Sequence, residues 1–324
     1  MSLFTLAELE AAAALVRTEV PPTPQYAWPL LKRRTGADVW VKHENHTPTG
    51  AFKVRGGLVY MDWLKSSGVP VAGVISATRG NHGQSIAYAA ARVGIPSVIV
   101  VPEGNSVEKN AAMQAFGAEL VVHGRDFDEA KDHAGRLAKE RSLHFVPSFD
   151  RRLVMGVATY ALELFRSAGP LQTVYVPIGL GSGICGMITV RDLLGLDTEI
   201  VGVVSEHAAA YALSFEAGRV IATNSAKTFA DGMAVRQPNP EAFSIISKGA
   251  ARILRLTEDE IALAMRAYFT DTHNVAEGAG AAPLAGLIRE KDRMAGRRVG
   301  VILCGGNIDR PVFGTVLAGK TPKV

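Results

Sequence analysis

Hydrophobic residues in this chain of 324 residues follow two different spacings. Short runs of consecutive apolar residues, typical of strands buried on both faces, alternate with longer stretches in which apolar residues recur every three or four positions, as in helices. Such an alternation predicts βαβ units and an α/β fold with parallel sheets covered by helices. The clearest strand runs are SVIVV at 97–101, TVYVP at 173–177, EIVGVVS at 199–205 and RVGVIL at 298–303.

The predicted strands fall into two groups, which indicates two open parallel-sheet α/β domains. We expect a large domain from residues 1–50 and 150–324 and a small domain from residues 51–149. The strands of the smaller group are expected near residues 73–76, 97–101, 120–122 and 144–146.

In the larger group, the sequence predicts two further helices and one long surface loop. Thr257 followed by Glu260 has the spacing of a capping box, so a helix is expected at 257–272. A further helix is predicted at 281–295 from its apolar spacing. Residues 214–235 show no clear period and are predicted to loop over the surface.

The composition is that of an ordinary soluble protein, with 48% hydrophobic and 20% charged residues. No apolar run approaches the ~18 residues that a membrane helix needs, and Glu8 and Glu10 make the N-terminal stretch an amphipathic helix rather than a secretion signal. The net charge of +4 is dispersed along the chain, which argues against a nucleic-acid surface. Two cysteines, Cys185 and Cys304, cannot form a disulfide framework, so a cytoplasmic setting is expected.

Four distinctive loops follow predicted strands, at the sheet edge where ligands bind in open parallel sheets. They lie at residues 78–83, 179–183, around Glu277 and at 304–307. Their common place at the carboxyl ends of strands is more informative than any single loop.

The loop GLGSG also opens a helix, so its backbone N–H groups can approach an anion closely, and it predicts a phosphate site. The same loop fits a dinucleotide site in which Glu206 would bind a ribose, or a glycine-rich turn without a ligand. The residues of this loop are Gly179, Leu180, Gly181, Ser182 and Gly183.

Lys53 is predicted to stand where a loop enters a helix, next to the aromatic ring of Phe52. An amine among apolar neighbours has a lowered pKa and can attack a carbonyl carbon. The alternative is a lysine that forms an ordinary surface ion pair.

The loop TRGNHG has groups suited to an anion and to a ring oxygen. Thr78 and the neighbouring backbone N–H groups can hold a carboxylate, and Asn81 can donate a hydrogen bond to a ring oxygen or serve as a helix N-cap. His82 fits a structural histidine as well as a binding residue. Cys304 can face a ring nitrogen or be a small buried apolar residue. A carbonyl-reactive lysine, a phosphate cradle and polar groups for a ring together predict pyridoxal 5′-phosphate as the cofactor.

Through these loops, the sequence resembles the serine/threonine dehydratase family of the fold type II (tryptophan synthase β-like) pyridoxal phosphate enzymes. The resemblance covers nearly the whole chain through four ordered motifs, TGAFKVRG, SATRGNHG, GLGSG and CGGN. It implies a large domain that binds the cofactor and a small domain that closes over an amino-acid substrate. It also implies a homodimer, and it implies that the C-terminal regulatory domain of the biosynthetic threonine dehydratases is missing here.

The resemblance also assigns roles to individual residues. It implies that Lys53 binds the cofactor covalently and acts in catalysis, that Phe52 packs against the ring, and that Asn81 contacts the ring hydroxyl. Cys304 would face the ring nitrogen and Glu277 would lie beside the cofactor. The phosphate would be held by residues 179–183, and the substrate by Thr78, Arg79, Gly80, Asn81 and His82.

Two positions depart from the serine-racemase branch of this family. Arg79 stands where that branch has a serine that acts as a second base, and arginine remains protonated, so racemisation is not expected as the main activity. Arg79 is instead expected to bind a carboxylate or to form a surface ion pair. Glu206 matches one ligand of that branch's metal site, but Ala212 takes the place of the other, so no metal site is assigned beyond Glu206 itself.

The expected activity is the β-elimination of water from a β-hydroxy-α-amino acid such as threonine or serine, giving a 2-oxo acid and ammonia. Alternatives within the family are a dehydratase for 3-hydroxyaspartate or phenylserine and an amino-acid racemase. Alternatives of another class are a nicotinamide-dependent oxidoreductase and a non-catalytic protein that binds pyridoxal phosphate or a metabolite.

Overall fold

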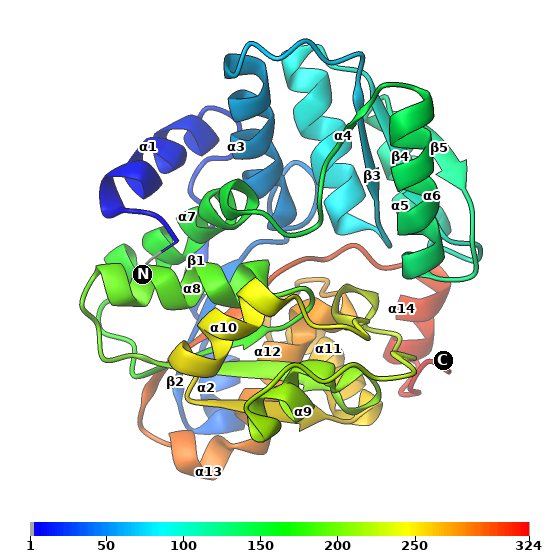
Figure 1. The fold of residues 1–324 in the computed structure, drawn as a ribbon. Coiled ribbons are helices and arrows are strands. Elements are labelled where there is room, and N and C mark those ends of the chain that lie inside the picture. Colours follow the sequence, from blue (N-terminus) through cyan, green and yellow to red (C-terminus); the bar gives the residue numbers. More distant parts are fainter. Residues whose placement is uncertain (1–2, 324) are drawn as a thin grey trace.

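Two sheets organise the computed structural model, which describes residues 3–323 (Figure 1). One has six strands in the order β1-β2-β10-β7-β8-β9, and the other has four in the order β5-β4-β3-β6. All pairs are parallel except β1 with β2. The strands are β1 Gln25–Ala27, β2 Asp38–His43, β3 Val74–Ala77, β4 Ser97–Val101, β5 Glu119–Val122, β6 His144–Phe145, β7 Thr173–Pro177, β8 Glu199–Ser205, β9 Arg252–Leu256 and β10 Arg298–Leu303.

Helices cover both sheets, and Figure 1 shows the four-stranded sheet with α4, α5 and α6 in the upper half of the molecule. We call this part the small unit and the six-stranded sheet with its helices the large unit. The helices are α1 Leu6–Arg17, α2 Pro29–Thr35, α3 Lys53–Ser66, α4 Asn81–Val93, α5 Val107–Ala115, α6 Phe127–Glu140, α7 Arg151–Ser167, α8 Ser182–Leu193, α9 Ala210–Ala217, α10 Pro240–Gly249, α11 Glu258–Thr272, α12 Gly278–Arg289, α13 Lys291–Met294 and α14 Arg310–Leu317, with 3-10 turns η1 Glu206–Ala208 and η2 Asp231–Met233.

The small unit shows why its strands are continuous apolar runs. Ile75 and Val100 pack with residues of α6, while Val74 and Ile99 pack with residues of α4 on the opposite face. Because both faces are covered by helices, every position of β3 and β4 is buried. The predicted α/β class with two parallel-sheet units is confirmed, and the domain limits at residues 51 and 149 stay a prediction.

The predicted helix at 257–272 is confirmed as α11. The Thr257 side chain accepts a hydrogen bond from the backbone N–H of Glu260, and the Glu260 carboxylate accepts one from the N–H of Thr257. This reciprocal pair is the capping box that the sequence indicated.

The expectation of one helix over 281–295 is wrong, because the chain leaves helical geometry at Glu290 between α12 and α13. The Glu290 carboxylate there accepts hydrogen bonds from Tyr175 at 2.5 Å and from Arg252. The segment 214–235 is a loop only in part, because α9 continues to residue 217. The first three residues of α9, Ala210 to Ala212, are all buried. The first turn of this helix therefore lacks the exposed polar face from which an amphipathic helix is predicted.

A fully buried group of four charged side chains joins α3 to the large unit. The Arg55 guanidinium donates to Glu44 at 2.7 Å and to Glu163 at 2.8 Å, and the Lys42 amine donates to Glu163 at 2.7 Å. Two cations therefore balance two carboxylates away from water, which is the arrangement that buried charges require. Arg55, two residues beyond Lys53, thereby ties the first turn of α3 to the large unit. Among residues 3–323, no helix combines the length and the apolar character that a bilayer crossing needs.

Candidate active site

Lys53 is the first residue of α3, as the sequence predicted for a lysine at a loop-to-helix junction. Its amine donates a hydrogen bond to Oγ of Ser182 at 2.6 Å and lies 4.9 Å from the centre of the Phe52 ring. The Phe52 ring in turn meets Tyr160 edge-on. Burial of the amine in this surrounding lowers the pKa of Lys53 to about 8. The surface ion pair considered from the sequence is not formed with any residue in 3–323.

The loop that carries Lys53 is joined to the CGGN turn after β10. The backbone N–H of Phe52 donates to the carbonyl of Cys304 at 2.9 Å, and that of Gly306 donates to the carbonyl of Gly50 at 3.0 Å. A Cβ at Gly305 would lie 2.6 Å from a carboxylate oxygen of Glu277, so only glycine fits there. The Lys53, Cys304 and Glu277 regions, far apart in the sequence, thus meet at one edge of the large sheet.

The GLGSG loop lies between β7 and α8, and α8 begins at Ser182. Its N-cap is Gly181, with a φ of 104°, and no side chain caps the helix. Uncapped N–H groups at a helix start favour an anion. A Cβ at Gly179 would collide with the carbonyl oxygen of Gly232, so the backbone of this loop is held close to η2.

The side-chain amide of Asn81 is held between two partners. Its Nδ2 donates to Oε1 of Glu277 at 2.6 Å, and its Oδ1 accepts from Nδ2 of Asn307 at 2.9 Å. Asn81 is the first helical residue of α4, and the N-cap is Gly80. The N-cap role considered for Asn81 is therefore wrong.

The other residues of the TRGNHG loop differ in their surroundings. The Thr78 hydroxyl oxygen accepts hydrogen bonds from the N–H groups of Gly80 and Gly83, so it shapes the loop from inside. Arg79 is exposed and makes no hydrogen bond or ion pair with any residue in 3–323. Nε2 of His82 lies 3.1 Å from the Ser76 hydroxyl, and burial lowers the pKa of His82 to about 3, so the ring is neutral.

A buried cation that the sequence gave no reason to single out lies beside these groups. The amine of Lys109, on α5, donates to Asp231 at 2.6 Å and to Oε2 of Glu277 at 3.0 Å. Burial opposes the charge of Lys109, but the two carboxylates outweigh it and raise the pKa of the amine. Burial also raises the pKa of Glu277, although Lys109 acts against this. Lys109 follows the apolar spacing of an ordinary amphipathic helix, so only the tertiary fold reveals it.

Cys304 directly follows β10 and is buried near Glu277 and Lys53. Burial and the Glu277 carboxylate raise the pKa of its thiol well above the usual range, so the thiol is neutral. Glu206 lies apart from this group, in η1, where its carboxylate is 3.7 Å from His207. No group of three or more side chains suited to hold a metal ion occurs within residues 3–323.

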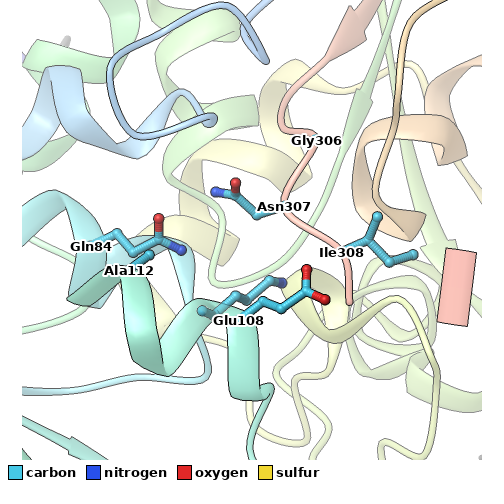
Figure 2. Close-up of a pocket in the computed structure, with 7 residues that line it drawn as sticks. Gln84, Glu108, Ala112, Gly306, Asn307 and Ile308 are labelled. Atoms are coloured by element: carbon cyan, nitrogen blue, oxygen red, sulfur yellow. The ribbon is translucent and has the colours of Figure 1, made fainter. Parts of the chain in front are cut away.

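A small pocket opens beside the Lys109 cluster, between the two units. Figure 2 shows Gln84 of α4, Glu108 of α5 and Asn307 of the loop after β10 around it. Its volume is about 170 Å³, and Lys109 is part of its wall. Lys109 itself is nevertheless only 4% exposed.

A family model described as pyridoxal-phosphate dependent enzyme matches residues 16–305. The L-threonine ammonia-lyase of Geobacter sulfurreducens is 36% identical over 289 residues, which are 89% of this chain and 71% of that protein. The L-threo-3-hydroxyaspartate ammonia-lyase of Saccharomyces cerevisiae is 31% identical over 322 residues, which are 99% of this chain and 98% of that one.

Among solved structures, the processed threonine deaminase isoform 2 of Solanum lycopersicum superposes with a TM-score of 0.86. It is 28% identical, and the match covers 98% of this chain and 95% of that one. Against the biosynthetic L-threonine dehydratases the match covers only 56% of their length.

Proposed function

We propose, from the premise that this chain belongs to the family of pyridoxal-phosphate dependent enzymes, that it removes water from a β-hydroxy-α-amino acid. The chain is a pyridoxal phosphate enzyme of the ammonia-lyase and dehydratase group, which ends the alternatives of a nicotinamide oxidoreductase and a non-catalytic binding protein. The products would be a 2-oxo acid and ammonia. The observation that carries the proposal is the half-buried Lys53 amine at the open start of α8.

The residues present fit this cofactor. Lys53 supplies an amine whose pKa of about 8 leaves part of it unprotonated near neutral pH, as attack on an aldehyde requires. The uncapped start of α8 at residues 181–183 supports phosphate binding, because no side chain competes for its N–H groups. Cys304, as a neutral thiol, would face a ring nitrogen without protonating it.

The cofactor and Lys53 have separate roles in the proposed reaction. When bound, pyridoxal phosphate supplies an electron sink for the negative charge left on the substrate's α-carbon. The Lys53 amine would accept the α-proton of the substrate, for which a base with a pKa of about 8 is well matched. Loss of the β-hydroxyl as water gives an enamine, which tautomerises and is hydrolysed to the 2-oxo acid and ammonia.

Threonine and serine are the first substrates to expect, and 3-hydroxyaspartate is the second candidate. One observation favours the latter: the guanidinium of Arg79 is exposed at the start of α4 and has no carboxylate partner among residues 3–323. A side-chain carboxylate of the substrate would supply one. The relative from Saccharomyces cerevisiae that matches nearly end to end acts on that compound by its name. Racemisation is disfavoured because Arg79 cannot serve as a base.

The proposal is tested with purified protein and a panel of hydroxy amino acids that includes threonine, serine, 3-hydroxyaspartate and phenylserine. We expect ammonia and the matching 2-oxo acid in equal amounts, and we expect both to disappear in Lys53→Ala. Turnover by Lys53→Ala at the wild-type rate would refute the assignment. A homodimer and a cytoplasmic setting stay predictions, the first open to light scattering.

A further inference from the structure

We propose that Lys109 is a positioning residue: docking of α5 places its charge beside Glu277, which stays ionised and holds the Asn81 amide in one orientation toward the cofactor ring. The inference rests on the cofactor site of the proposed function and on no particular substrate. According to this inference, the small unit both covers the site and, through Lys109, sets the hydrogen bond that the cofactor ring receives from Asn81.

A chain of hydrogen bonds links Lys109 to Asn81 through Glu277. Lys109 donates to one oxygen of Glu277 at 3.0 Å, and Asn81 donates to the other at 2.6 Å. Asn307 donates to Oδ1 of Asn81 at 2.9 Å and to the carbonyl of Thr49 at 2.7 Å. An ionised Glu277 can only accept, so it selects the orientation of Asn81 in which Nδ2 points toward it. The second hydrogen on that Nδ2 is then free for a ring oxygen.

A protonated Glu277 would remove this selection. Its carboxyl would offer an O–H donor, which Oδ1 of a flipped Asn81 could accept. The flipped amide would bring its NH₂ group against the NH₂ group of Asn307, where two donors repel, and it would redirect Oδ1. The charge on Glu277 therefore decides which face Asn81 presents.

The negative charge of Glu277 depends on a neighbouring cation. Glu277 is 1% exposed, and a carboxylate so deeply buried stays ionised only beside a cation. The ionisable groups around it are Lys109 of α5, Asp231 of η2 and Cys304 after β10, with Lys53 of α3 acting on Cys304. Asp231 is a second anion and Cys304 is neutral, so Lys109 is the compensating charge.

Lys109 and its carboxylate partners come from different units. Lys109 belongs to the small unit, whereas Asp231, Glu277 and Asn307 belong to the large unit. The start of α5 is fixed on the large unit by Asp309, whose carboxylate accepts hydrogen bonds from the N–H groups of Val107 and Glu108, both at 3.3 Å. The cluster is therefore complete only when α5 is docked.

The loop that carries Asn81 is shaped to admit Lys109. A Cβ at Gly80 would collide with Cδ of Lys109, so the methylene chain of the lysine runs directly against the backbone of the residue before Asn81. Glycine at position 80 thus allows the lysine to pass between the TRGNHG loop and α12.

The test compares Lys109→Met with the matched control Arg236→Met. Arg236 forms another ion pair between the units, with Asp126 and Asp128, but does not contact Glu277. In Lys109→Met at neutral pH we expect a protonated-carboxyl band in the infrared spectrum, with and without cofactor, that disappears in the double variant Lys109→Met/Glu277→Gln. Wild type and Arg236→Met should lack that band.

The bound cofactor gives a second readout. Its visible spectrum should become pH-dependent in Lys109→Met, and Glu277→Gln should reproduce the low-pH form of that spectrum with Lys109 in place. The value of kcat/KM should fall about tenfold to a hundredfold, as for loss of one hydrogen bond to a charged group, and Lys109→Arg should recover part of it.

Two results would overturn the inference. One is an absent carboxyl band together with a wild-type spectrum in Lys109→Met, and the other is an identical response in Arg236→Met. If Lys109→Met does not fold, a wild-type spectrum in Glu277→Gln at every pH overturns it equally. The infrared readout needs no turnover, so a wild-type protein that lacked dehydratase activity would refute the proposed function and leave this inference standing on its own data.

Discussion

The amine of Lys53 donates a hydrogen bond to the hydroxyl of Ser182 at 2.6 Å, across 129 residues of sequence. The first residue of α3 and the first residue of α8 are therefore in direct contact, and each opens a helix. This relationship places the amine that we propose to react with an aldehyde next to backbone N–H groups that can hold a phosphate.

Ser182→Ala removes this contact. In the bound state the Ser182 hydroxyl is expected to donate to the cofactor phosphate instead, and a hydrogen bond to a charged group contributes about 1.5–3 kcal/mol. We therefore expect the affinity of the apoenzyme for pyridoxal phosphate to fall roughly tenfold to a hundredfold. Cofactor titration followed by visible absorbance measures it. Unchanged affinity would show that the hydroxyl does not help to assemble the site.

The pKa of Lys53 leads to a prediction about pH. Burial lowers it to about 8, and the neutral amine is the form that attacks an aldehyde. The rate at which the apoenzyme takes up the cofactor covalently should rise with pH up to about 8 and level off above it. A rate that kept rising to pH 10, as for an ordinary lysine, would contradict the lowered pKa.

Gly179→Ala tests the shape of the proposed phosphate loop. The new methyl group would collide with the carbonyl oxygen of Gly232, and the loop must move. We expect a large loss of cofactor affinity. Gly135→Ala, in α6, is the matched control, because outside its chain neighbours and its own helix backbone no atom of residues 3–323 lies within 4 Å of the added carbon. The substitution also favours a helix by about 1 kcal/mol. Equal behaviour of the two variants in cofactor titration would argue against a tight loop.

Arg79→Ala distinguishes the two candidate substrates. If the guanidinium binds a side-chain carboxylate, kcat/KM for 3-hydroxyaspartate should fall by about tenfold or more while that for threonine changes little. Steady-state kinetics with both compounds measures this. An equal fall for the two substrates would instead place Arg79 on a group that they share.

Glu163→Gln tests the buried charges beneath Lys53. Loss of this carboxylate leaves Lys42 and Arg55 undercompensated, and breaking a buried pair costs about 3–5 kcal/mol. Arg166→Gln, on the same helix, breaks only an exposed pair with Glu10 and should cost less than about 1 kcal/mol. Denaturant unfolding compares them, and similar midpoints would show that the network adds little stability.

The parts of the fold that the sequence predicted are those determined locally. The strands at 97–101, 173–177, 199–205 and 298–303 were placed to the residue, because continuous apolar runs end sharply at polar or proline positions. The strand β9, in contrast, was not predicted, since Arg252 and Arg255 interrupt its apolar pattern. Arg252 is tolerated there because Glu199 and Glu290 pair with it, which only the tertiary structure shows.

The site residues that could be predicted are likewise those with a distinctive local sequence. Lys53, Asn81, Glu277 and Cys304 stood in loops with distinctive composition, and the structure brings their regions together. Lys109 stands inside an ordinary helix, so nothing local set it apart from a solvated lysine. Its role depends on two carboxylates 122 and 168 residues away, a distance at which spacing carries no information.

The most direct measurement is reductive trapping of the cofactor with borohydride, followed by peptide mass mapping. We predict a single pyridoxyl adduct on the peptide that contains Lys53. No adduct, or one on another lysine such as Lys42 or Lys109, would contradict the central claim that the amine of Lys53 carries the cofactor.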